Sequence, residues 1–83
     1  MSERNIALFI NTHESMRAEM FLRLYGIDFK TVIKPRSITS ECGMGLEFNG
    51  SDEKKVTEIC KDNHLKLEGI FLSKENGTWE RKE

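Results

Sequence analysis

The order in which strand-like and helix-like hydrophobic patterns follow one another along the chain restricts its possible folds more than any other feature. Four segments carry the short apolar runs or the alternating pattern of β-strands: residues 6–10, 29–34, 44–49 and 67–73. Two others carry apolar residues at the three-and-four spacing of a buried helix face: residues 13–25 and a segment that begins at Ser51 or Asp52. The sequence therefore predicts the order strand, helix, strand, strand, helix, strand.

This order is that of the ferredoxin-like βαββαβ fold, an α+β architecture. Right-handed crossovers would give a four-stranded antiparallel sheet in the order 4-1-3-2, with both helices on one face. Asn76-Gly77 predicts a tight turn, after which residues 78–81 return as a short β extension that carries the only tryptophan, Trp79. A chain of 83 residues has the size of one domain. We expect residues 1–83 to form a single ferredoxin-like domain, with 74–83 as a C-terminal hairpin extension.

The sheet face away from the helices is expected to be apolar, because the plan places Phe9, Val32 and Phe71 there. An exposed apolar face of this size is normally covered. A homodimer through this open sheet face, or the C-terminal hairpin with Trp79, could cover it. The first helix is also expected to leave some apolar surface uncovered: Met16, Met20 and Leu24.

Charge and cysteine content exclude several classes of protein. Thirteen basic and fourteen acidic residues leave a net charge of −1, whereas nucleic-acid binding requires a clustered basic face. No apolar run approaches the roughly 20 residues of a membrane span, and the first residues do not resemble a signal peptide. Two cysteines do not make a disulfide framework. We expect a reduced, cytoplasmic protein with neither nucleic-acid nor membrane partners.

The segment 35–45 joins two predicted strands and is roughly twice as long as a hairpin loop requires. It contains the only proline and one of the two cysteines, Cys42. In the predicted fold this loop lies at the end of the sheet where the first helix begins. Cys42 is therefore expected near the helix N-terminus, close to Thr12 and His13, with Arg36 nearby.

Such a position would favour the thiolate form of Cys42, which is the nucleophilic form of a cysteine. A helix N-terminus and neighbouring cations lower a thiol pKa from about 8.5 to between about 3.5 and 7.5. Arg36 and His13 could supply positive charge, and backbone N–H groups of residues 40–43 could form an anion-binding concavity. Glu41 would oppose this effect if its side chain faced the sulfur. The alternative interpretation is that Cys42 is a small residue with an inert thiol.

Other candidate residues are better explained by structure. Cys60 lies on the apolar stripe of the second helix and is predicted to pack in the core, so a disulfide with Cys42 is not expected. His13 can be a solvated residue of a first helical turn, and His64 can complement a helix dipole. No close-spaced pair of ligands predicts a metal site.

Four stretches carry a resemblance to a known family: residues 11–19, 26–27, 35–46 and 68–71. Within about residues 5–73 the chain resembles the small bacterial and archaeal Se/S carrier-like proteins. The resemblance implies that the Cys-Gly cysteine holds sulfur or selenium as a persulfide or selenosulfide. Carried over to this sequence, Cys42 would be the carrier thiol. The residues that would shape its loop are Pro35, Arg36, Ser40 and Gly43.

Two hypotheses for the function follow. In the first, Cys42 takes a sulfur or selenium atom from a donor such as a cysteine desulfurase and delivers it to an acceptor protein. The chain would then be a carrier rather than a turnover enzyme, and it would need no bound cofactor. In the second, the domain is a non-enzymatic module that binds a small ligand or a protein, and a Cys42→Ser substitution would have no effect.

Overall fold

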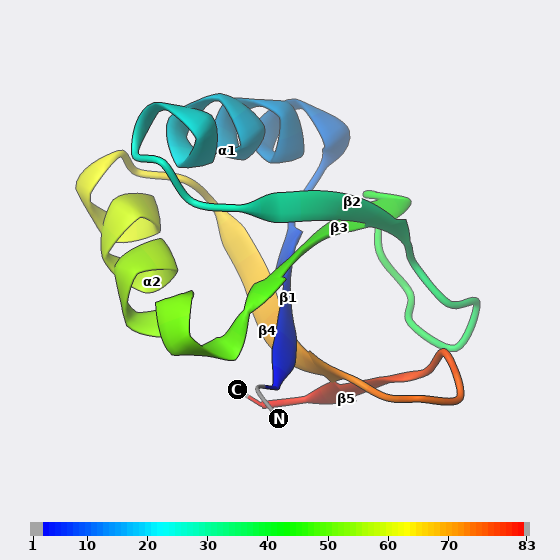
Figure 1. The fold of residues 1–83 in the computed structure, drawn as a ribbon. Helices are drawn as coiled ribbons and strands as arrows, with labels where there is room; N and C mark the ends of the chain where they lie inside the picture. Colours follow the sequence, from blue (N-terminus) through cyan, green and yellow to red (C-terminus); the bar gives the residue numbers. More distant parts are fainter. Residues whose placement is uncertain (1–2, 83) are drawn as a thin grey trace.

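The computed structural model describes residues 3–82 of the chain. Its elements follow one another in the predicted order (Figure 1): β1 (Arg4–Phe9), α1 (Thr12–Leu24), β2 (Phe29–Ile33), β3 (Met44–Asn49), the 3₁₀ turn η1 (Gly50–Asp52), α2 (Glu53–Asp62), β4 (Leu67–Ser73) and β5 (Trp79–Arg81). The bounds of β3 and β4 are those predicted from the sequence, and the other predicted bounds differ by at most two residues. Neither helix in residues 3–82 is long and apolar enough to cross a membrane.

The strands form one antiparallel sheet, which confirms the α+β architecture. The expected four-stranded sheet needs a correction, because the sheet has five strands in the order β2-β3-β1-β4-β5. The fifth strand pairs with the outer edge of β4, where Ser73 lies opposite Trp79 and Phe71 opposite Arg81. The turn before β5 contains Gly77 at φ 84°, a conformation that favours glycine. The C-terminal extension is therefore part of the sheet.

Both helices pack on the same core. Its buried members from the strands and helices are Ala7, Phe9, Ala18, Leu22, Leu46, Phe48, Val56, Ile59, Cys60 and Ile70. Phe9 was predicted to point away from the helices, and that prediction is wrong. Residues two apart in a strand share a face, so Phe9 and Ala7 face the helices while Ile6 and Leu8 face the opposite side.

The N-terminus of α1 is fixed by polar contacts to the chain that follows α2. The side chain of Asn11 accepts a hydrogen bond from the amide of Glu14 at 2.9 Å, so Asn11 is the N-cap of the helix. The Glu14 carboxylate accepts one from the amide of Lys66 at 2.9 Å and pairs with Arg17 at 3.1 Å. The Lys66 amide and then the Arg17 guanidinium lower the pKa of Glu14, against the effect of burial. Arg17 also donates to the carbonyl of Asn63.

The outer surface of α1 is partly apolar, as predicted. Its exposed members are Met16, Met20 and Leu24. Tyr25, the last residue of the predicted helical segment, is exposed because it lies at the C-cap, one residue beyond the helix. Gly26 follows at φ 75°, as expected of the residue that ends a helix.

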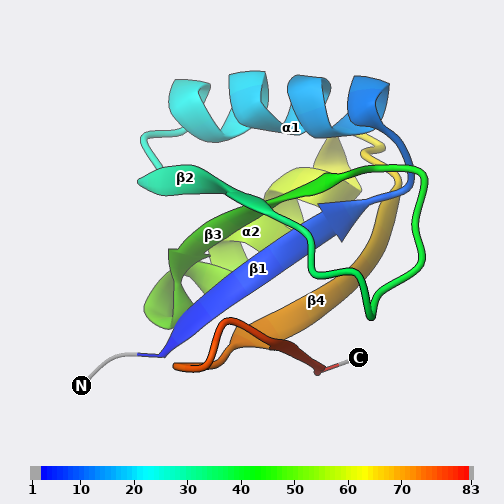
Figure 2. The ribbon, with the colours of Figure 1, turned by 90° about the vertical axis from the view of Figure 1, so that its right-hand side faces the viewer.

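The sheet face away from the helices is covered by the chain itself. Ile6, Leu8 and Phe71 are buried there together with Cys42. Val32, Ile38 and Trp79 pack against them, so this second cluster draws on the β2–β3 loop and on the C-terminal hairpin: Ile6, Leu8, Val32, Ile38, Cys42, Phe71 and Trp79. Figure 2 shows the β2–β3 loop passing in front of β1 while α2 lies behind the sheet. Of the two covers expected for this face, the C-terminal hairpin with Trp79 is the one that the structure shows, together with the β2–β3 loop.

Candidate functional site

Cys42 lies at the end of the β2–β3 loop, immediately before β3. Its exposed fraction is 0%, and it belongs to the second cluster with Ile6, Leu8 and Phe71. Solvent therefore does not reach this sulfur. The physical reason is that Ile38, on the same loop, packs against the cluster and holds the loop over the face of the sheet.

The polar atoms of Cys42 have local partners. Its Sγ donates a hydrogen bond to the carbonyl of Met44 at 3.1 Å, and its amide donates one to Oγ of Ser40 at 3.2 Å. The thiol proton is therefore held by a backbone oxygen. The Cys42 amide is engaged by Ser40 and does not contribute to the anion-binding concavity that we expected in residues 40–43.

Three further contacts hold the loop closed. Oγ of Ser40 donates to Oε1 of Glu68 on β4 at 2.9 Å. Lys34 donates its backbone N–H to the carbonyl of Gly43 at 2.9 Å and its ammonium group to the carbonyl of Ile38. Glu68 was not predicted as a site residue, although it lies in one of the stretches that carry the family resemblance.

The residues expected around Cys42 do not pair with it in the described structure. Thr12, His13 and Arg36 are exposed, and within residues 3–82 no hydrogen bond or ion pair joins any of them to Cys42. The loop does start at the end of the sheet where α1 begins, as predicted. It then turns over the helix-free face, whereas α1 packs on the other face (Figure 2).

Pro35 and Gly43 lie at the two ends of the loop. The carbonyl of Pro35 accepts the amide of Ile38 at 3.1 Å, which closes a turn, and the carbonyl of Gly43 accepts the amide of Lys34. A Cβ atom added at Gly43 would meet nothing within 4 Å. A residue with a Cβ atom would therefore also fit at position 43 without a steric clash.

Cys60 is a core residue, as predicted. It packs with the helices on the opposite side of the sheet from Cys42, and burial raises the pKa of its thiol to about 11. Both cysteines are free. Within residues 3–82, no group of three or more His, Cys, Asp or Glu side chains is arranged to hold a metal ion.

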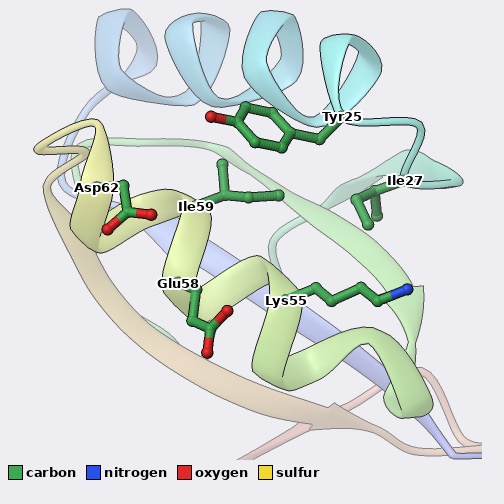
Figure 3. A pocket seen from close by; sticks show the side chains of 6 residues that line it. All are labelled: Tyr25, Ile27, Lys55, Glu58, Ile59 and Asp62. Atoms are coloured by element: carbon green, nitrogen blue, oxygen red, sulfur yellow. The ribbon is translucent and has the colours of Figure 1, made fainter.

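A small pocket lies between the C-terminal end of α1 and α2 (Figure 3). It has a volume of about 150 Å³ and is lined by Tyr25, Ile27, Lys55, Glu58, Ile59 and Asp62. Pockets for drug-sized ligands measure roughly 300–1,000 Å³. The pocket lies on the helix side of the sheet and contains no cysteine, so it is separate from the surroundings of Cys42.

Comparison with known proteins gives one match. A family model described as "Putative Se/S carrier protein-like" matches residues 4–72. No curated protein and no solved structure matches the chain. The matched region begins with β1 and reaches into β4, so it contains Cys42 and Ser40 and the Glu68 carboxylate that holds the loop. It ends before β5.

Proposed function

The chain belongs to the Se/S carrier protein-like family, and from this premise we propose that it carries a sulfur or selenium atom on Cys42 for delivery to an acceptor protein. The observation that carries the proposal is that the family match includes Cys42 together with the loop that encloses it. Cys60 is a poor alternative, because a thiol whose pKa is raised to about 11 is not a nucleophile near neutral pH.

The transfer would be a displacement between sulfur atoms. The Cys42 thiolate attacks the terminal sulfur of a donor persulfide, R–S–SH, so that a new S–S bond forms and the donor S–S bond breaks. The products are the Cys42 persulfide and the donor thiolate, which takes up the proton that Cys42 released. No external oxidant or reductant is consumed. With a selenium donor, the same displacement gives a selenosulfide.

Burial sets a condition on this chemistry. The thiol must lose its hydrogen bond to the Met44 carbonyl, and the β2–β3 loop must open before a donor reaches the sulfur. Arg36 is exposed on the same loop and would then pair with the persulfide anion. In the proposal, Pro35, Ser40 and Gly43 shape the loop, and Thr12 and His13 have no assigned role.

The proposed setting is the reducing cytoplasm, where a thiol outside any structural disulfide stays free to take part in the transfer. The donor would be a persulfide-forming enzyme such as a cysteine desulfurase, and the acceptor a second protein. The chain would act as a carrier without a bound cofactor, since the displacement needs only the Cys42 thiolate and the donor persulfide.

The direct test is to incubate the protein with a cysteine desulfurase and cysteine, and then to map the modified residue by mass spectrometry. We expect a mass increase of one sulfur atom on Cys42, which reduction removes. Cys42→Ser should abolish the increase, and the matched variant Cys60→Ala should retain it. A folded protein that never gains sulfur on Cys42 would refute the proposal.

The second candidate is a protein-interaction module. It is favoured by the burial of Cys42 and by the exposed apolar side chains of α1: Met16, Met20 and Leu24. In this case Cys42 would be a packing residue, and Cys42→Ser would change stability without changing a biological activity. Protein isolated from its native cells distinguishes the two, because only a carrier would be recovered partly as the persulfide or selenosulfide.

A further inference from the structure

Two side chains of β5 lie against the sheet face that buries Cys42. The rings of Trp79 and Phe71 have centroids 5.7 Å apart at an angle of 53°. The guanidinium of Arg81 lies over the Phe71 ring, 4.9 Å from its centroid. Trp79 also packs against the cluster that contains Cys42. The C-terminal hairpin thus forms part of the cover over the cysteine cluster.

Two glycines provide the room for this cover. A Cβ atom at Gly45 would lie 2.9 Å from a ring carbon of Trp79, and one at Gly69 would lie 2.6 Å from the guanidinium of Arg81. Both glycines belong to the region matched by the family model, whereas Trp79 and Arg81 lie beyond its last matched residue. The surface that receives the hairpin is therefore inside the matched region, and the hairpin is outside it.

The hairpin ends in a short strand at the edge of the sheet, and Lys82 beyond it pairs with Glu53 and donates its amide to the carbonyl of Ile70 at 2.8 Å. The strand β5 has three residues, lies at an edge and pairs only with β4 (Figure 1). Its three side chains are exposed or partly exposed, whereas on β1 all side chains after Arg4 are buried. Short edge segments with little buried surface open locally at a lower free-energy cost than the global fold does.

We propose that the hairpin of residues 74–81 gates Cys42, with Trp79 as the side chain that closes the gate. When the indole lies on Gly45, the cluster is sealed and the thiol stays on the Met44 carbonyl. When the hairpin lifts, the apolar cover over the cluster is incomplete and the β2–β3 loop loses part of the surface on which it packs. The purpose assigned to the gate rests on the proposed function, whereas access to the thiol can be measured without it.

The test compares the alkylation rates of the two cysteines in Trp79→Ala. Iodoacetamide is added to the folded protein, and the label on Cys42 and Cys60 is quantified separately by peptide mass spectrometry. We expect Cys42 to react about tenfold faster or more, because loss of a large aromatic contact shifts the opening equilibrium by at least this factor. Cys60 should keep its wild-type rate, since it lies on the other side of the sheet.

Two further variants complete the experiment. Trp79→Phe should recover much of the protection, because a second aromatic ring can still lie on Phe71. Glu75→Ala, at an exposed position of the same hairpin, should behave as the wild type. An unchanged Cys42 rate in Trp79→Ala would overturn the gate. Equal acceleration of Cys42 and Cys60 would also overturn it, because it would indicate global unfolding.

The gate and the carrier function can fail separately. If Cys42 of Trp79→Ala is alkylated rapidly but takes no sulfur from a desulfurase, the gate stands and the carrier proposal fails. If wild-type Cys42 takes sulfur and Trp79→Ala neither loads nor alkylates faster, the carrier stands and the gate fails.

Discussion

The hydroxyl of Ser40 donates a hydrogen bond to Oε1 of Glu68 at 2.9 Å, and the same oxygen of Ser40 accepts the amide of Cys42 at 3.2 Å. One serine therefore joins the cysteine loop to β4, although Ser40 and Glu68 are 28 residues apart in the chain. A hydrogen bond to a charged group contributes more to stability than one between neutral groups. This hydrogen bond fixes the loop to β4, while Ile38 and Trp79 cover the cysteine cluster with apolar side chains.

Ser40→Ala should loosen the loop without unfolding the domain. The substitution removes the bond to Glu68 and leaves the Cys42 amide without its side-chain acceptor, so we expect a loss of about 1–3 kcal/mol in the free energy of unfolding. Alkylation of Cys42 should accelerate, and urea titration should report the loss. Ser37→Ala, at an exposed serine of the same loop, is the matched control. Wild-type alkylation in Ser40→Ala would show that the bond does not hold the loop.

Gly45→Ala should destabilise the protein through two close contacts. The added Cβ would lie 2.5 Å from Cγ2 of Ile6 and 2.9 Å from the Trp79 ring. Overpacking of this kind costs about 1–3 kcal/mol. The part of the cost that arises at Trp79 should vanish in the Trp79→Ala background, so the two substitutions should couple in a double-mutant cycle. Gly43→Ala is the control, because its Cβ would meet nothing within 4 Å.

Glu14 should make the stability depend on pH in the acid range. Its pKa is lowered in the folded protein below the ordinary value of 4.5, so the folded state holds the proton less tightly than the unfolded state. The resulting stability is present in full above the ordinary pKa and is lost as the pH falls through the lowered one. Glu14→Gln should reduce the free energy of unfolding at pH 7 and flatten its decline below pH 4.5.

Urea titrations at several pH values test the Glu14 prediction. Glu58→Gln, which removes an exposed carboxylate of α2, provides the control for the loss of one negative charge. The prediction is wrong if Glu14→Gln and the wild type lose stability in parallel on acidification.

Cys60 should resist alkylation in the folded protein at pH 7–9. Burial raises the pKa of its thiol to about 11, so the thiolate is scarce in this range, and the chain packed around it excludes the reagent. The same shift means that the folded state binds the Cys60 proton more tightly than the unfolded state. Its contribution to stability is present below the ordinary thiol pKa and declines as the pH rises toward 11. Rapid labelling of Cys60 at pH 8 in a protein that circular dichroism shows to be folded would contradict this.

Local pattern was sufficient to predict the elements of the fold. The bounds of β3 and β4 and the turn at Gly77 depend on residues close together in sequence. The predicted strand count was one too low because the three residues of β5 were treated as an extension rather than as a member of the sheet.

The face assignment of β1 shows where pattern fails. Residues 6–10 are all apolar, so the alternation that separates the two faces of a strand is absent from the sequence. Phe9 was consequently placed on the wrong face. In the folded chain, side chains of α1 and α2 pack on Ala7 and Phe9. This contact fixes which face of β1 is turned toward the helices.

By itself, the sequence determined the element order, the antiparallel α+β plan, the core position of Cys60 and the family to which the chain belongs. Only the tertiary structure decided where the β2–β3 loop lies and whether the Cys42 sulfur meets solvent. The physical reason is the range of the interactions involved. Caps, turns and helical periods depend on neighbours within a few residues, whereas the loop direction depends on contacts of Ile38 and Ser40 with strands that are distant in the sequence.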